Sequence, residues 1–250
     1  MTGFVDVHSH AVPSGDDGAR TFEEAVELCR IAVDTGTRVL FATPHAHAGW
    51  DSYPRTRERE RLFAESFPKV RAAAAQFGLE LRRGWEVFPT VLRDADPEEF
   101  VLEGTRAVLI EFPGHWLGFK DDSALTLEAA DRLVAAGLVP VVAHPERSIG
   151  LRADFAVARA LVDRGCLLCP NGDSALGGNG QAAEELLWRL LDEGLVALIA
   201  SDGHRARRPP QLDRAYEVLA DRYGAEAVAP LLDGSALPWV EAPISARTAE

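Results

Sequence analysis

The sequence predicts an α/β fold, a TIM-like (β/α)7 barrel in a single domain, from three observations. Short apolar runs rich in Val, Ile or Leu occur seven times along the 250 residues. Amphipathic helix-like segments lie between most of these runs, as expected when helices cover a parallel sheet. A Rossmann glycine pattern is absent, so a barrel is favoured over an open, doubly wound sheet.

Each predicted strand is one of the apolar runs. Aliphatic runs of this length are typical of strands buried on both faces. In chain order they are 4–7 (FVDV), 38–43 (RVLFAT), 79–87 (LELRRGWEV), 107–112 (AVLIEF), 139–144 (VPVVAH), 166–171 (CLLCPN) and 196–201 (VALIAS).

The first predicted helix, 21–36, has the clearest boundaries. Thr21 is a suitable N-cap, Glu24 follows three residues later as in a capping box, and Gly36 ends the segment. The same apolar spacing and a terminal glycine predict further helices at 125–137, 154–165 and 180–194. The stretch from Trp50 to Phe77, with its charge run RTRERERLF, is predicted to be a solvated helix and a lid-like loop.

Composition limits the classes of function. Hydrophobic residues make up 47% and charged residues 26% of the chain, which suits one domain over residues 1–240 and a flexible tail over 241–250. A formal net charge of −13 argues against nucleic-acid binding, which needs a basic face. Neither a membrane-length apolar run nor a signal peptide is present, so a cytoplasmic location without membrane insertion is expected. The oligomeric state is left open.

The cysteines predict structural rather than redox roles. Cys29, Cys166 and Cys169 are too few for a disulfide framework. The CLLC spacing lies inside an apolar strand, where residues three apart point to opposite faces. Buried thiols are therefore expected.

Polar side chains capable of chemistry follow the predicted strands. In a parallel barrel the C-terminal strand ends meet at one rim, where active sites lie. Any one of these residues alone could be a cap, a turn or a packed core group, but their joint pattern predicts a multinuclear metal site. They are His8, His10, His45, His47, Glu86, Glu111, His144, Glu146, Arg147, Asn171, Asp173, Asp202 and His204.

The types of ligand limit the choice of metal ion and of reaction. His8 and His10, at positions i and i+2, project from one strand face, as chelation of one ion requires. Imidazole nitrogen and carboxylate oxygen without thiolate suit Mn, Fe or Zn. The number of ligands exceeds what one ion needs, so two or three ions and hydrolysis of phosphate esters are predicted. A G-x-S-x-G nucleophile motif is absent.

These motifs support a resemblance to a known family. DVHSH, TPH, AHPER and SDGH resemble, in order and spacing, the motifs of the PHP (polymerase and histidinol phosphatase) metallophosphoesterases. A closer resemblance is to the bacterial manganese-dependent protein-tyrosine phosphatases of capsule and exopolysaccharide operons, through DVHSHAVPSGDDGA, GWEV, IEFP, HPER, NGDSALG and SDGH…RPP. It runs from about Phe4 to Tyr216 and implies a distorted (β/α)7 barrel, the PHP fold, with a trinuclear metal centre.

The resemblance also implies roles for particular residues. Two or three divalent ions, Mn first with Fe, Zn, Mg or Co as alternatives, would bind the phosphate and activate a hydroxide for in-line attack. Arg147 would grip phosphate oxygens with its planar fork, or pair with Glu146 or a rim carboxylate. Asp17 and Glu111 join it as catalytic residues, Asp17 as a proton source for the leaving phenolate. The implied metal ligands are His8, His10, Asp17, His45, Glu86, Glu111, His144, Asp202 and His204.

Other residues have no assured counterpart in the family. For His47 a supporting or surface role is expected rather than ligation. His115 and Trp116 are expected either to form a wall of the substrate mouth or to anchor a surface loop. The C-terminal tail lacks the ending associated with the family.

Three functions compete at this point. The resemblance implies hydrolysis of phosphotyrosine in a protein, with the tail of a bacterial tyrosine kinase of polysaccharide assembly as the expected substrate. A small-molecule phosphatase, such as a histidinol-phosphate phosphatase, would use the same site. A metal-binding accessory or regulatory PHP domain without activity is the alternative from another class.

Overall fold

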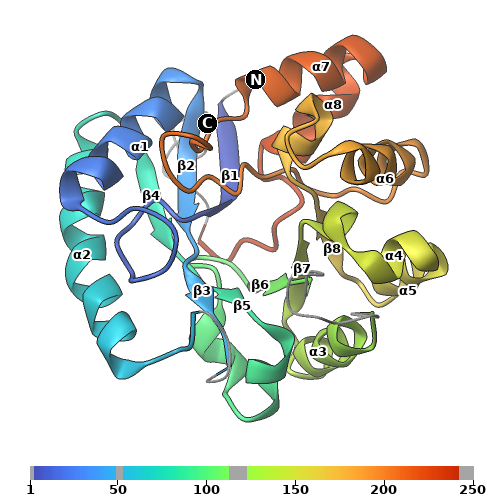
Figure 1. The fold of residues 1–250 in the computed structure, drawn as a ribbon, viewed down its shortest axis with the longest axis horizontal. Coiled ribbons are helices and arrows are strands. Elements are labelled where there is room, and N and C mark those ends of the chain that lie inside the picture. The colour runs from blue at the N-terminus through green and yellow to red at the C-terminus, as the bar shows by residue number, and fades with distance from the viewer. Residues whose placement is uncertain (1–2, 49–52, 113–122, 242–250) are drawn as a thin grey trace.

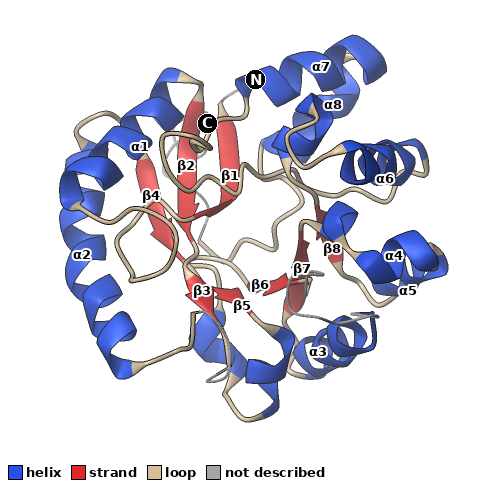
Figure 2. Ribbon diagram, in the orientation of Figure 1, coloured by secondary structure: helices blue, strands red, loops and turns tan. Residues whose placement is uncertain are grey.

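The computed structural model describes residues 3–48, 53–112 and 123–241, with the helices around the outside and the strands nearer the centre (Figure 2). The strands are β1 (Phe4–Ser9), β2 (Thr37–Ala42), β3 (His45–Ala46), β4 (Glu80–Arg83), β5 (Glu86–Val87), β6 (Ala107–Glu111), β7 (Val139–Ala143) and β8 (Leu167–Cys169). The α-helices are α1 (Phe22–Asp34), α2 (Arg57–Ala75), α3 (Ser123–Ala135), α4 (Ile149–Ala153), α5 (Ala156–Asp163), α6 (Gln181–Asp192), α7 (Asp213–Tyr223) and α8 (Ala225–Leu232).

All pairs between the named strands are parallel, but the strands form two sheets instead of one closed barrel. One sheet has the order β1-β2-β4 and the other the order β3-β5-β6-β7-β8. The predicted strand 196–201 makes only isolated parallel bridges, from Val196 to Leu168 and from Ala200 to Asn171. Gly203 then bridges to Ser9 of β1. The prediction of an α/β fold with parallel strands is confirmed, whereas a continuously paired barrel is not seen among the described residues.

The boundary between the sheets falls at Pro44, directly after the predicted strand 38–43, and at Gly84, inside the predicted strand 79–87. Pro44 lacks an N–H and separates β2 from β3. The predicted strand 79–87 is two strands. Gly84 N–H donates to Ala42 O (2.9 Å) and Glu86 N–H donates to Pro44 O (3.1 Å), but Pro44 has no N–H with which to return a bond. Residues on either side of these breaks therefore belong to different sheets.

Helix α1 begins as the sequence predicts. The Thr21 hydroxyl accepts a hydrogen bond from the Glu24 backbone N–H (3.2 Å), and Gly36 has a φ of +94° just after the helix. At the other end of the chain, α7 lies beside β1, where the rings of Phe4 and Tyr216 are 5.7 Å apart (Figure 1). The first and last parts of the fold thus pack together.

Helix α2 is less solvated than its charge run suggests. Thr56 caps its N-terminus, and Phe63, Phe67 and Val70 are buried between α1 and β4. The predicted helix is present with a solvated charged face, and its opposite face is buried, which was not predicted from the sequence. The predicted lid-like loop, with Trp50, falls partly on residues outside those described.

The three cysteines lie in the interior of the protein. Cys29, Cys166 and Cys169 are buried thiols, as predicted. No helix among the described residues is long and apolar enough to cross a membrane. His115, Trp116 and the tail from residue 242 onward lie outside the described residues.

Candidate metal centre

Strand β1 brings two imidazoles to the site. Val5 and Val7 point into the apolar core, so the alternate residues His8 and His10 share the opposite face. Their Nε2 atoms are 3.3 Å apart, and both rings are almost fully buried. Below them, the Asp6 carboxylate accepts hydrogen bonds from the backbone N–H groups of His8 (3.3 Å) and Ser201 (3.0 Å).

The carboxylate of Glu86 lies at the centre of the cluster and is fully buried. Its Oε2 is 3.3 Å from Nε2 of His8 and 3.3 Å from Nε2 of His10. The same oxygen lies 2.8 Å from His45 Nδ1, because β3 pairs with β5 in the register that sets His45 opposite Glu86. Its Oε1 lies 2.8 Å from His144 Nε2. Four histidines therefore surround one carboxylate.

His144, directly after β7, and Asp202 complete this group. Both residues have a constrained backbone conformation. Asp202 Oδ1 lies 3.5 Å from His8 Nε2 and 3.6 Å from His10 Nε2. His144 and Asp202 are the described non-glycine residues with positive φ, at 37° and 52°. Such backbone conformations are costly and concentrate at functional sites.

Asp17 and His204 form the outer side of the cluster. Asp17 Oδ1 lies 3.2 Å from His204 Nε2 and 3.6 Å from His45 Nε2. The Asp17 side chain is partly exposed, whereas the other carboxylates of the cluster are buried. On the opposite side of the His45 ring, His47 Nε2 lies 2.8 Å from Glu111 Oε2 at the end of β6. A surface position for His47 is thereby ruled out, since it is 1% exposed.

Three residues that support the ligand cluster were not predicted from the sequence. Asp16, rather than Asp17 alone, enters the cluster: its Oδ2 is 2.9 Å from His10 Nδ1, and its Oδ1 accepts from Gly18 N (3.0 Å). Carboxylates commonly orient metal-binding histidines in this way. Arg59, from the charge run, donates to the carbonyls of Ser14 (3.1 Å) and His45 (3.0 Å). The Tyr53 ring stacks on His45 at a centroid distance of 5.1 Å.

Neighbouring carboxylates raise the pKa values of two histidines in the cluster, although burial lowers that of His204. Burial disfavours the charged form of His45, yet the charge of Glu86 raises its pKa to about 9. Burial likewise opposes the charged form of His10, but the hydrogen bond and charge of Asp16 raise its pKa well above the usual value. Burial alone would raise the pKa of Asp17, whereas the hydrogen bond and charge of His204 lower it to about 2.

The donor atoms fit a cluster of divalent cations. Protons on His10 and His45 offset carboxylate charge here, and cations that bind imidazole nitrogen and carboxylate oxygen would replace those protons. Thiolates are absent from the described donor groups. Four groups, each with ligand atoms within 4.8 Å of one another, are His10/Asp17/His45/His204, His8/His10/Asp202, His8/Glu86/His144 and His45/His47/Glu111.

A cavity of about 260 Å³ opens over this cluster and carries two arginines. Arg147 Nη1 lies 3.3 Å from Asp202 Oδ2, and Arg208 Nη2 lies 3.5 Å from the same oxygen. Arg147 therefore pairs with a rim carboxylate, while Glu146 is buried and accepts from Ser174 Oγ (2.7 Å). Both guanidinium groups are partly exposed and line the cavity.

The sequence matches a known family over nearly its whole length. The model of the family described as capsular polysaccharide synthesis, CpsB/CapC, matches residues 4–236. The chain belongs to the CpsB/CapC family. It is 30% identical over 233 residues to the tyrosine-protein phosphatase CpsB of Streptococcus pneumoniae, covering 89% of this chain and 92% of that protein. It is 29% identical over 226 residues to the tyrosine-protein phosphatase YwqE of Bacillus subtilis (strain 168), covering 89% and 86%.

Solved structures agree with this family assignment. A chain from the crystal structures of YwqE from Bacillus subtilis and CpsB from Streptococcus pneumoniae, described as unique metal-dependent tyrosine phosphatases, matches with a TM-score of 0.73. That match has 28% identity and covers 91% of this chain and 90% of the other. The phosphotriesterase homology protein of Escherichia coli matches with a TM-score of 0.52 at 13% identity, covering 92% and 96%. This second likeness shows the fold alone.

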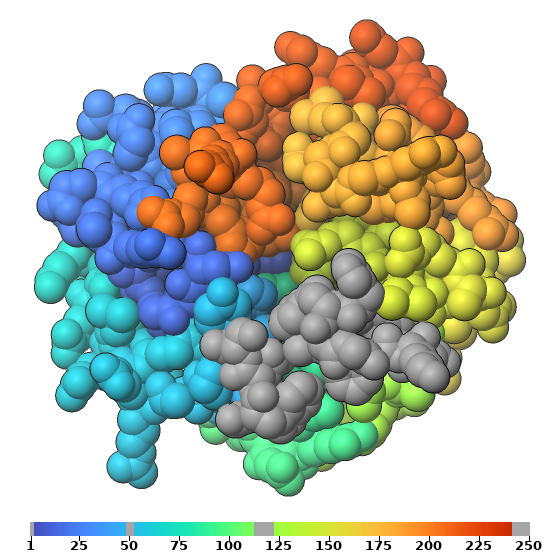
Figure 3. Space-filling view, viewed as in Figure 1, coloured from blue at the N-terminus to red at the C-terminus, as the bar shows by residue number. Residues whose placement is uncertain are grey.

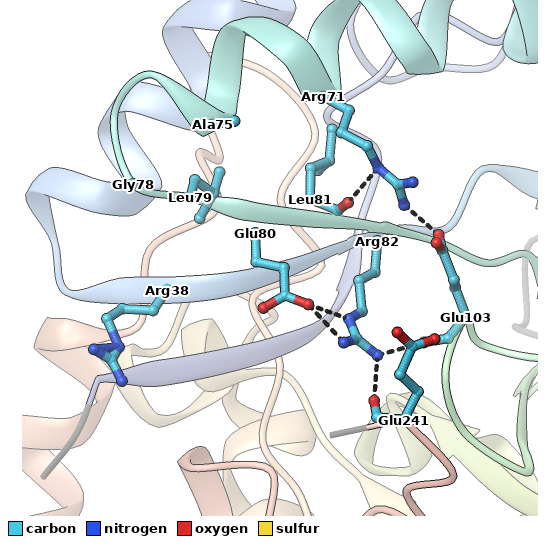
Figure 4. A pocket seen from close by; sticks show the side chains of 10 residues that line it. All are labelled: Arg38, Arg71, Ala75, Gly78, Leu79, Glu80, Leu81, Arg82, Glu103 and Glu241. Carbon is cyan, nitrogen blue, oxygen red and sulfur yellow. Dashed lines mark hydrogen bonds and ion pairs between the residues drawn. The ribbon is translucent and has the colours of Figure 1, made fainter. Parts of the chain in front are cut away.

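A larger cavity, of about 600 Å³, lies elsewhere, between the end of α2 and β4 (Figure 4). Its charged groups mostly contact one another: Arg71 pairs with Glu103, and Arg82 donates to Glu80 Oε1 (2.8 Å). Histidines are absent from its lining. With its charges already paired and no metal-binding nitrogen, it is a weaker candidate for catalysis than the smaller cavity.

The N-terminal and C-terminal parts of the chain, which both contribute to the smaller cavity, also meet on the surface. The blue N-terminal part of the chain borders an orange C-terminal part on the face shown in Figure 3. In the interior, hydrogen bonds from His10 N to Gly203 O (2.7 Å) and from Asp202 N to His8 O (3.0 Å) also join the two ends of the chain. Ligands from the two ends of the sequence are thereby held at one place.

The loop carrying the two aspartates packs too closely for any side chain at Gly18. A Cβ there would lie 2.2 Å from the carbonyl oxygen of His10 and 2.5 Å from its Cβ. Gly18→Ala should therefore lower the free energy of unfolding of the metal-free protein by about 1–3 kcal/mol and weaken metal binding through Asp16 and Asp17. Denaturant unfolding measures the first effect and equilibrium dialysis the second.

Glu27→Ala, on the exposed face of α1, is the control for this prediction. It should change the stability by less than about 0.5 kcal/mol, as is usual for surface sites. If Gly18→Ala were as stable as this control, the loop would be free to move away from His10, and the close packing would not matter.

Proposed function

We propose that this chain is a metal-dependent protein-tyrosine phosphatase that hydrolyses phosphotyrosine in proteins. One observation carries the proposal: the cavity over the histidine–carboxylate cluster also carries Arg147 and Arg208. Family membership and the names of the relatives support it, since CpsB and YwqE are both called tyrosine-protein phosphatases. The substrate we infer is a phosphotyrosine protein of polysaccharide assembly, such as the tail of a tyrosine kinase.

The metal centre is inferred to hold two or three divalent ions, with Mn as the first choice. The residues that would hold them are His8, His10, Asp17, His45, Glu86, Glu111, His144, Asp202 and His204. When bound, such ions supply Lewis-acid chemistry and activate water for attack on phosphorus at neutral pH. The supporting scaffold is inferred to be one domain over residues 1–240, a distorted (β/α)7 barrel interrupted at Pro44 and Gly84.

The side chains around the cavity would have different roles in binding and hydrolysis of the substrate. The guanidinium groups of Arg147 and Arg208 would bind the equatorial phosphate oxygens, a geometry that a planar fork matches well. The aromatic ring of Tyr53 lines the same cavity and offers an apolar wall to the tyrosine ring of the substrate. Asp17, with its pKa lowered to about 2, is ionised at neutral pH. That state suits a ligand better than a donor of a proton to the leaving phenolate.

Arg147→Ala and Arg208→Ala should each lower kcat/KM for a phosphotyrosine peptide by about 10²–10³-fold, the usual effect of removing one donor to transition-state charge. Arg147→Lys should recover only part of the loss, because lysine cannot bind two oxygens in one plane. Metal content should stay at the wild-type level in all three variants. Loss of metal from Arg147→Ala would show instead that its contact with Asp202 organises the ligands.

The test of the proposed function is a substrate panel with the purified protein in Mn²⁺. We expect turnover of phosphotyrosine peptides, with His144→Ala inactive. A far higher kcat/KM on histidinol phosphate would favour a small-molecule phosphatase. Retained metal without turnover of any phosphate ester would favour the accessory domain. Activity unchanged in His144→Ala would contradict a catalytic centre at this cavity.

A further inference from the structure

We propose that His47 is an additional metal ligand, holding an ion together with Glu111 on the side of His45 away from Asp17. The inference rests on the proposed metal centre and extends it by one residue. His47 Nε2 lies 2.8 Å from Glu111 Oε2 and 3.1 Å from His45 Nδ1. These three residues place ligand atoms within 4.8 Å of one another, and all three are buried.

The local sequence repeats the pattern that makes β1 a source of ligands. His45 and His47 are two residues apart, as His8 and His10 are, and side chains two apart in a strand share a face. Between them, Ala46 points into the apolar core. Strand β3 therefore presents a second H-x-H pair, with ring centroids 4.5 Å apart, to the same interior as β1.

The backbone holds His47 in place on both sides. Its N–H donates to the Tyr53 carbonyl (3.2 Å), and its own carbonyl accepts from Arg55 N (2.9 Å). The Phe88 ring packs against the imidazole at a centroid distance of 5.5 Å. A buried ring fixed by packing and by a backbone bridge is well placed to act as a ligand, since little further ordering is needed on binding.

The orientation of His45 separates this position from the one at Asp17. The Nε2 atom of His45 faces Asp17 at 3.6 Å, whereas its Nδ1 atom faces His47 and the Glu86 carboxylate. An ion between His47 and Glu111 therefore lies across the imidazole ring from the Asp17–His204 edge. Nitrogen from His47 and oxygen from Glu111 are donors that Mn, Fe and Zn accept.

The competing role for His47 is to orient Glu111 by a hydrogen bond. His47→Ala cannot separate the two roles, because loss of a residue that supports a ligand already weakens metal binding by roughly 10–100-fold. His47→Gln can, because the glutamine amide still donates to Glu111 but lacks a nitrogen that binds a cation. Phe88→Leu, which alters the packing against His47 but keeps its ligand nitrogen and Glu111, is the control for lost packing.

The experiment titrates metal-free wild type, His47→Gln, His47→Ala and Phe88→Leu with Mn²⁺ by equilibrium dialysis, with circular dichroism to verify folding. We expect both His47 variants to bind about one ion fewer per chain, or to bind the weakest ion at least roughly tenfold less tightly. Phe88→Leu should match wild type. If His47→Gln binds like wild type, His47 only positions Glu111 and the inference fails.

The wild-type result distinguishes this failure from failure of the metal centre itself. A wild-type chain that takes up no Mn²⁺ would overturn the proposed function together with the role of His47. A wild-type chain that takes up Mn²⁺, beside a His47→Gln chain with equal content and affinity, would overturn only the role of His47. If neither His47 variant folds, a Glu111→Gln variant that keeps the full metal content would equally overturn it.

Discussion

Glu86→Gln should lose at least about one metal ion per chain and lower kcat/KM at least ~100-fold, more than the loss of a residue that merely supports a ligand. The substitution keeps the shape of the side chain and removes only its charge. Glu86 contacts four imidazoles, so its carboxylate is the group that the largest number of candidate ligands share. Metal content after gel filtration and steady-state kinetics measure the two effects.

The control for this prediction is Glu80→Gln on β4. Glu80 is also largely buried, but it pairs with Arg82 in the larger cavity and lies outside the cluster. Its metal content and kcat/KM should remain at wild-type values. If Glu86→Gln retained all of its metal and its activity within about twofold, Glu86 would not be a shared ligand, and the centre would have to be rebuilt around Asp202 and Asp17.

Much of the fold was predictable because local patterns and tertiary packing agree in most segments. The apolar runs at β1, β6 and β7 coincide with strands, and Thr21 caps α1 as its capping box predicts. The strand at 79–87 was predicted as one because its apolar pattern runs through Gly84. It separates into β4 and β5 because the neighbouring segment carries Pro44, which accepts a bond from Glu86 N–H but has no N–H to donate in return.

The seventh predicted strand likewise shows that an apolar residue pattern does not determine backbone pairing. Residues 196–201 are as apolar as a strand and lie between β8 and β1, but they pair only through single bridges. Backbone pairing depends on the twist and spacing of the neighbours, which a residue pattern does not contain. A closed barrel was therefore the natural prediction from repeated units, and the division into two sheets was not.

The proposed site was predictable to the extent that its residues follow strands. Eight of the nine predicted ligands lie at or near the ends of predicted strands, Asp17 lies in the loop after the first, and all nine belong to the clusters of ligand groups around Glu86. Their role as ligands stays a prediction. Asp16, Tyr53 and Arg59 were not found, because they lie in a loop or a helix away from the strand ends, and their contacts with His10 and His45 depend on how those segments fold. Arg208 is the arginine of the RPP motif, and the resemblance included this motif without giving Arg208 a role in the site.

The second large effect concerns the metal-free protein. Removing bound ions with EDTA should abolish phosphatase activity and lower the melting temperature. An ion held only by the folded state at 100 times its dissociation constant adds about 2.7 kcal/mol of stability. For a domain of this size, 1 kcal/mol corresponds to about 2–4 °C, so each ion should contribute about 5–11 °C. Calorimetry with and without Mn²⁺ measures the shift.

Two controls separate metal loss from other effects of the chelator. EDTA saturated beforehand with Mn²⁺ should leave the melting curve unchanged, and Glu86→Gln should show a smaller response to free EDTA than wild type. The metal-free protein should still fold, because protonated histidines such as His45 offset the charge of Glu86 when cations are gone. An unchanged wild-type melting curve in free EDTA would mean that the buried carboxylates are neutralised by those protons alone. The cluster would then be a hydrogen-bonded core, and the proposed hydrolysis would lack its metal centre.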